Sequence, residues 1–171
     1  SGIKITPELT GLNEFAGTVV HSTEYTDGEP WVGKRALIIG TGNSGHDVAQ
    51  DLHSHGAQAT LVQRRPTTVV SVEPSGQLVY GLYKEGPPTE DCDLIVTSVP
   101  FPILKRTYQL IVKESQKADK DLLEKLEAVG FKMDVGEDGT GFQMKYLQRG
   151  GGYYLNVCLL YTSPSPRDSN L

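Results

Sequence analysis

The sequence predicts an α/β fold whose centre is a parallel βαβ unit. A short apolar run, Arg35–Ile39, stops at a glycine, which is typical of a buried parallel strand. The glycine-rich segment Gly40–Gly45 follows directly. His46–His55 then carries apolar residues at helical spacing, with Gly56 placed to end the helix. A second run, Ala59–Gln63, predicts another short strand, and the whole stretch has the length of one βαβ unit, about thirty residues.

The flanking segments give weaker patterns. Ser1–Trp31 is punctuated by proline and glycine and predicts a connecting segment with one short strand around Gly17–His21. Two interpretations remain open for Glu90–Val99. Its β-branched residues favour a strand, whereas Thr89 followed by acidic residues, with Pro100 beyond, favours a helix. The helix is the favoured interpretation.

The second half of the chain predicts added helices and a β-hairpin. Leu104–Val112 and Lys120–Val129 have helical patterns, and Gly130 is placed to end the second helix. Phe131–Val135 and Phe142–Leu147 alternate apolar and polar residues around the turn-like sequence GEDGTG, which is typical of a hairpin. We therefore expect a Rossmann-like dinucleotide-binding domain, a parallel βαβ core with these additions.

Bulk properties narrow the class of protein. A chain of 171 residues is long enough for one domain and too short for two full dinucleotide-binding domains. The net charge of −5 argues against a nucleic-acid partner. No apolar run approaches the roughly 18 residues that span a membrane. Cys92 and Cys158 make no disulfide or metal-binding pattern, so we expect no metal, a cytoplasmic location and a small buried Cys92. We expect His46, His53 and His55 to be solvated, since their spacing builds no metal-binding face.

The end of the chain differs abruptly in character from the GGGYYLNV sequence before it. Cys158–Asp168 resembles the in-frame translation of a sequencing adapter, which predicts that residues 158–171 are a non-native tail. A natural tail rich in serine and proline is the alternative interpretation. The start at Ser1, without methionine, predicts a chain cut at both ends.

The glycine-rich segment has the GxGxxG pattern of a dinucleotide site, with a strand before it and a helix after it. Gly40 permits a tight turn, Gly42 lets a pyrophosphate approach the backbone, and Gly45 lets the helix pack close to the strand. The helix N-terminus offers free N–H groups to the phosphates, and Asn43 and Ser44 can add hydrogen bonds.

The end of the second predicted strand determines which nucleotide is preferred. NAD sites carry an acidic residue there, which holds the ribose 2′-hydroxyl. This chain has Gln63, Arg64 and Arg65, and a guanidinium group suits a 2′-phosphate. The sequence thus predicts NADPH over NADH. Arg65 could equally be a solvated surface charge.

Two stretches carry a resemblance to a known family. Residues Phe15, Gly17, His21 and Tyr25 fit the FxGxxxHxxx(F/Y/W) signature of class B flavin monooxygenases, at a suitable distance from the glycine motif. That family includes flavin-containing monooxygenases, plant YUCCA-type enzymes and Baeyer–Villiger enzymes. Pro88–Tyr154 resembles a bacterial and fungal branch of flavoprotein monooxygenases.

The resemblance implies a two-domain flavoprotein of which this chain is an incomplete part. In the family, one dinucleotide fold binds FAD and a second binds NADPH. NADPH reduces the flavin, and one oxygen atom of O2 enters an organic substrate. No second GxGxxG is present, so FAD would be bound mainly by a missing N-terminal part, and no catalytic residue is assigned. The implied division is a linker at 1–33, the NADPH-binding domain at 34–147 and a return toward the FAD domain at 148–157.

Several points stay open at this level. His21 is either a hinge residue near the nicotinamide or a structural histidine. Tyr153 or Tyr154 faces the active site, or both form a core aromatic pair, which is the favoured interpretation. A disulfide-reductase type of pyridine nucleotide–flavin oxidoreductase and a non-catalytic NADP-binding module are the competing functions. Substrate and oligomeric state are not predicted.

Overall fold

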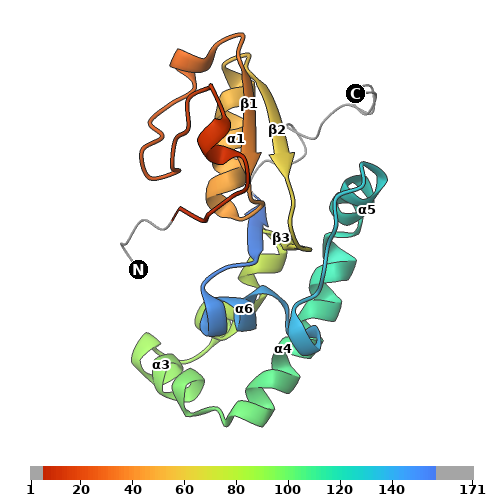
Figure 1. Cartoon of the computed structure of the whole chain (residues 1–171). Coiled ribbons are helices and arrows are strands. Elements are labelled where there is room, and N and C mark those ends of the chain that lie inside the picture. The colour runs from red at the N-terminus through yellow and green to blue at the C-terminus, as the bar shows by residue number, and fades with distance from the viewer. Residues whose placement is uncertain (1–5, 157–171) are drawn as a thin grey trace.

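The structure is a computed structural model that describes residues 6–156 (Figure 1). The expected tail at 158–171 and Cys158 lie outside the described residues. The described strands are β1 (Arg35–Ile39), β2 (Gln58–Val62), β3 (Thr68–Ser71) and β4 (Tyr153–Asn156). The α-helices are α1 (Asn43–Ser54), α2 (Gly81–Glu85), α3 (Thr89–Ser98), α4 (Phe101–Ala118), α5 (Lys120–Ala128) and α6 (Gly141–Arg149). The 3-10 turns are η1 (Leu12–Glu14), η2 (Glu29–Trp31), η3 (Ser75–Tyr80) and η4 (Glu137–Gly139).

The predicted βαβ unit is present. β1 and β2 pair in parallel, with Arg35 opposite Gln58 and Ile39 opposite Val62, and α1 packs against both strands (Figure 1). The helix begins inside the glycine motif, at Asn43, three residues earlier than the apolar pattern suggested. It ends where Gly56 adopts a φ of 80°, as expected for a glycine after a helix.

Only one face of the β1–β2 sheet is covered by described residues. Ile38 faces α1, since its Cγ2 lies 3.8 Å from the position that a Cβ on Gly45 would take. Alternate side chains point the other way, and Leu37 and Ile39 are 64% and 46% exposed. The expectation of a fully buried strand is therefore wrong for this face, because no described element packs on it.

A second pair of strands lies below the first in Figure 1. β3 and β4 are parallel, with Thr68 opposite Tyr153, and an isolated bridge joins Thr67 to Met133. The main buried cluster lies on this pair and contains Val69, Leu122, Leu126 and Tyr154. The mixed α/β class with parallel strands is confirmed. Among the described residues, the two strand pairs form separate sheets and not one continuous sheet.

The helices of the second half follow the sequence pattern. α3 begins at Thr89 and ends before Pro100, so the helical interpretation of this stretch is confirmed. α4 is longer than its predicted core, and α5 ends just before Gly130, whose φ is 79°. Figure 1 shows α3 and α4 meeting at the lower end of the molecule, with α5 rising at one side.

Three predicted strands are wrong. The expected hairpin arm Phe142–Leu147 is helix α6, and its partner Phe131–Val135 forms only the isolated bridge at Met133. The described backbone around Gly17–His21 forms no strand. The GEDGTG segment turns on itself instead of pairing two strands, because the amide of Gly141 donates to the carbonyl of Val135 (2.8 Å) and starts a helix there. The buried residues of α6, Gly141, Gln143, Met144 and Lys145, all lie in its first half, so burial here does not follow the alternation that suggested a strand.

Candidate functional site

The glycine loop between β1 and α1 has the geometry that the motif predicts. Gly40 has a φ of 123°, a conformation that other residues rarely adopt. A Cβ on Gly45 would lie 2.4 Å from the carbonyl oxygen of Gly40, so only glycine lets α1 approach the loop this closely. A Cβ on Gly42 would meet nothing nearer than the carbonyl oxygen of Tyr153, at 3.9 Å. The space beside Gly42 is therefore open.

The start of α1 is free to receive an anion. Gly42 is the N-cap residue and supplies no side-chain acceptor for the first-turn amides. Ser44 in that turn is exposed. Free amides and the positive end of the helix dipole together suit a phosphate group. The loop thus fits the pyrophosphate of a dinucleotide.

Asn43 has a structural contact that the sequence did not reveal. Its side-chain Oδ1 accepts a hydrogen bond from the backbone amide of Leu155 at 3.0 Å. This contact joins the glycine loop to β4, 112 positions away in the chain. The side-chain nitrogen of Asn43, Nδ2, can still donate a hydrogen bond to a ligand.

The three residues after β2 divide into two kinds. The Gln63 side chain bonds both ways to the backbone of Lys132, with Nε2 donating to the carbonyl (2.7 Å) and Oε1 accepting from the amide (2.8 Å). Gln63 therefore anchors the segment after α5. Arg64 and Arg65 are exposed, and neither makes an ion pair with another described residue. Their guanidinium groups are available to an anionic ligand.

A buried contact ties these two regions together. The hydroxyl groups of Thr41, in the glycine loop, and Thr67, just after the arginines, lie 2.7 Å apart. Both residues are buried. This contact thus fixes the position of the glycine loop relative to the segment that carries the two arginines.

The N-terminal signature packs beside α1. The Tyr25 hydroxyl donates to Asp51 of α1 at 2.6 Å, and burial together with this carboxylate raises the pKa of Tyr25. The Phe15 ring lies over Gly17, where a Cβ would come within 2.5 Å of it. His21 is held in a local turn, with its Nδ1 2.8 Å from the Thr23 hydroxyl.

His46 differs most from its expected place. It is 3% exposed, so the prediction of a solvated histidine is wrong, whereas His53 and His55 are exposed as predicted. Its ring stacks on Tyr154 with centroids 3.9 Å apart, and Nδ1 lies 3.2 Å from the Gly42 carbonyl oxygen. Since a carbonyl only accepts, Nδ1 carries the proton. Burial lowers the pKa of His46 against the opposing effects of Gly42 and Asp47.

Comparison with known proteins finds a similarity in the first half of the chain. Residues 4–81 match the model of the flavin-binding monooxygenase-like family. The matched segment contains the N-terminal signature, the glycine loop, β2 and both arginines.

The similar proteins include plant indole-3-pyruvate monooxygenases. The chain is 39% identical over 79 residues to a probable indole-3-pyruvate monooxygenase YUCCA8 of Arabidopsis thaliana, covering 46% of this chain and 18% of that protein. It is 40% identical over 76 residues to indole-3-pyruvate monooxygenase YUCCA1 of Oryza sativa subsp. japonica, covering 44% and 19%. The chain thus spans about a fifth of the length of these curated relatives.

The part of the chain that lies outside the family match holds a charged cluster. Lys145, which is buried, donates to both oxygens of Asp134 (2.7 Å each) and to the carbonyl of Gly152 (3.0 Å). Thr68 and the amide of Gly136 also donate to Asp134. Burial by itself would raise the pKa of Asp134, but these donors together lower it.

Within residues 6–156, no group of three or more histidine, cysteine or acidic side chains is placed to hold a metal ion. No described helix combines the length and apolar character needed to cross a membrane. Cys92 is fully buried and unpaired, as the sequence predicted for it.

Proposed function

We propose that this chain is the NADPH-binding part of a flavin-dependent monooxygenase, an enzyme that reduces FAD with NADPH and inserts one oxygen atom of O2 into an organic substrate. One observation carries the proposal. A glycine loop with an uncapped helix start stands beside two exposed, unpaired arginines, at the place where NAD sites carry a carboxylate. The family match and the monooxygenase relatives support it.

In this proposal each part of the site has a separate role. The first-turn amides of α1, with Ser44 and the Asn43 amide nitrogen, bind the pyrophosphate. Arg64 and Arg65 bind the 2′-phosphate, which distinguishes NADPH from NADH. Gln63 contributes by fixing the backbone beyond β2. NADPH, when bound, supplies the hydride that reduces the flavin.

We propose that the described residues bind NADPH and that FAD is bound mainly elsewhere. The sequence has one GxGxxG motif, and that motif is assigned here to NADPH. We therefore place FAD mainly on a separate dinucleotide-binding domain of the whole protein, N-terminal to these residues. The proposed division is a linker at 1–33, the NADPH-binding domain at 34–147 and a return segment at 148–157. His21 belongs to that linker and is proposed to lie near the nicotinamide. The buried thiol of Cys92 supports a reducing, cytoplasmic setting.

A matched pair of nucleotides tests the proposal on the 171-residue chain. Isothermal titration would compare 2′,5′-ADP with 5′-AMP, which differs from it only by lacking the 2′-phosphate. A guanidinium–phosphate contact contributes about 1.5–3 kcal/mol, so we expect at least about tenfold tighter binding of 2′,5′-ADP, decreasing with added salt. Equal affinities would refute the assignment of the arginines. Tight, stoichiometric binding of FAD by the same chain would refute the assignment of the domain.

A further inference from the structure

His46 lies one turn into α1 and makes two contacts with the same atom of the glycine loop. Its backbone amide donates to the carbonyl oxygen of Gly42 at 3.1 Å, and its ring Nδ1 donates to that oxygen at 3.2 Å. A carbonyl oxygen has two lone pairs, so one residue supplies a donor for each of them. The Gly42 carbonyl is therefore held toward the helix.

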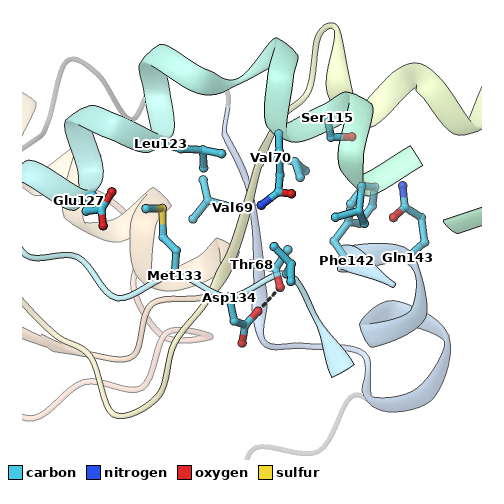
Figure 2. A pocket seen from close by; sticks show the side chains of 14 residues that line it. Thr68, Val69, Val70, Ser115, Leu123, Glu127, Met133, Asp134, Phe142 and Gln143 are labelled. Carbon is cyan, nitrogen blue, oxygen red and sulfur yellow. Dashed lines mark hydrogen bonds between the residues drawn. The ribbon is translucent and has the colours of Figure 1, made fainter. Parts of the chain in front are cut away.

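The ring of His46 is itself fixed by aromatic neighbours that lie far away in the sequence. It stacks on Tyr154 of β4, with planes at 17°, and makes an edge contact with Phe131 at 5.8 Å. Phe131 begins the segment that contains Asp134, to which Thr68 donates a hydrogen bond (Figure 2). Burial lowers the pKa of His46, so near neutral pH the ring keeps a single proton, on Nδ1. The ring thus remains a donor to the glycine loop.

The hydrogen bonds to Gly42 set the direction of the next amide. The peptide between Gly42 and Asn43 is trans, and in a trans peptide the C=O and N–H groups point in opposite directions. A carbonyl held toward the helix therefore directs the Asn43 amide out of the helix start. As the first residue of α1, Asn43 has an amide without an intrahelical acceptor. This amide is available to an anion at the loop.

We propose that His46 is a positioning residue of the nucleotide site, whose ring holds the Gly42 carbonyl and so keeps the Asn43 amide directed at the pyrophosphate. This inference rests on the proposed function and adds a residue to the same site. His46 is 3% exposed, so it acts through Gly42 and does not contact the nucleotide. Since it acts at the pyrophosphate, it affects nucleotides with and without a 2′-phosphate alike.

His46→Phe separates the hydrogen bond from the packing. Phenylalanine keeps a ring on Tyr154 and removes Nδ1, together with Nε2, which has no hydrogen-bond partner among the described residues. Isothermal titration of the 171-residue chain should show about five- to tenfold weaker binding of both NADPH and NADH, the effect of one hydrogen bond. The ratio of the two affinities and the melting temperature should change little.

Two control variants test the cause of this loss. His55→Phe removes the same kind of contact at the other end of α1, where Nδ1 of the exposed His55 lies 2.8 Å from the carbonyl oxygen of Asp51. It should leave both affinities unchanged. His46→Asn places an amide donor near the position of Nδ1 without the ring, so it should keep nucleotide affinity within about twofold while lowering the melting temperature.

The outcomes distinguish this inference from the proposed function. If the unmodified chain binds neither nucleotide, the proposed function fails and the inference fails with it. If it binds them and His46→Phe binds both equally well, only the role of His46 is refuted. A loss confined to NADPH, or an equal loss in His46→Asn, would also overturn that role.

An NMR measurement gives a second test if His46→Asn does not fold. Saturating NADPH should shift the signal of the Asn43 amide in the unmodified chain and shift it markedly less in His46→Phe. Equal shifts in the two proteins would show that the ring does not direct this amide.

Discussion

Arg64 and Arg65 follow the last residue of β2, and both side chains are open to solvent. Changing Arg64 to Ala should weaken NADPH binding by roughly ten- to hundredfold and leave NADH nearly unchanged, because only NADPH carries the 2′-phosphate. Arg65→Ala should have a smaller effect. Gly42→Val should weaken both nucleotides alike, since it blocks the pyrophosphate.

Titration of both nucleotides against the three variants measures these effects. The most informative material is the full-length enzyme, with the unmodified protein as reference. If Arg64→Ala loses affinity for NADH and NADPH equally, the residue does not bind the 2′-phosphate.

His46 gives the fold a dependence on pH with a defined sign. Its pKa is lowered in the folded protein from the ordinary value of 6.5, mainly by burial. Between the lowered value and 6.5 the unfolded chain binds a proton that the folded protein does not. The free energy of unfolding should therefore decrease as the pH falls from about 7.5 toward 5.5.

Urea unfolding at a series of pH values would measure this decrease. His46→Phe keeps a ring on Tyr154 and removes the titrating group, so its stability should change less over the same range. His53→Gln alters an exposed histidine and should behave like the unmodified chain. Identical pH profiles for His46→Phe and the unmodified chain would exclude His46 as the cause.

At the scale of elements, the Asp134–Lys145 pair joins β3, the loop after Met133 and helix α6. Lys145→Met should lower the free energy of unfolding by about 2–3 kcal/mol, because it leaves a partly buried carboxylate without its cation. We expect less than the about 3–5 kcal/mol of a fully buried pair, since the Asp134 side chain is 34% exposed. Chemical denaturation of this variant and of the exposed control Lys125→Met would measure the difference; the control should change by under about 0.5 kcal/mol.

The same pair has its own pH range. The pKa of Asp134 is lowered from its ordinary 3.8, so its stabilising contribution is fully present above that value. The contribution is lost as the pH falls through the lowered value. Equal stability losses for Lys145→Met and Lys125→Met would contradict the structural role of the pair.

The sequence predicted β1, the glycine loop, α1 and β2 because each depends on local chemistry. Gly40, Gly45 and Gly56 fix turns and close approaches that no other residue allows. The roles of Asn43 and Gln63 could not be predicted, because their partners lie 112 and 69 positions away. α6 was missed because its short alternating pattern fits a strand and a helix equally.

At the scale of the whole molecule, many large apolar side chains are exposed. They include Leu37 and Ile39 on the open face of the β1–β2 sheet, and Leu94, Phe101 and Ile103 at the α3–α4 corner. We predict that the isolated chain is marginally stable, melting below about 60 °C and binding an apolar dye. A sharp two-state melt of a soluble monomer above that temperature would contradict this.

Two substitutions at neighbouring positions of β1 compare an exposed apolar side chain with one that packs on α1. Leu37→Thr should reduce dye binding without lowering the melting temperature, because the side chain is largely in solvent. Ile38→Thr, on the neighbouring position that faces α1, should lower the melting temperature by several degrees. Scanning calorimetry with dye fluorescence would record both effects on the same samples.

The hydrogen bond from the Leu155 amide to the Asn43 side chain couples the conformation of the glycine loop to the position of β4. Any ligand that fixes Asn43 in place also favours the docked position of β4, and reciprocity requires docked β4 to favour that ligand by the same free energy. A substitution in β4 would then alter nucleotide affinity without touching the nucleotide. In the same way, occupancy of the glycine loop would change how firmly β4 is held.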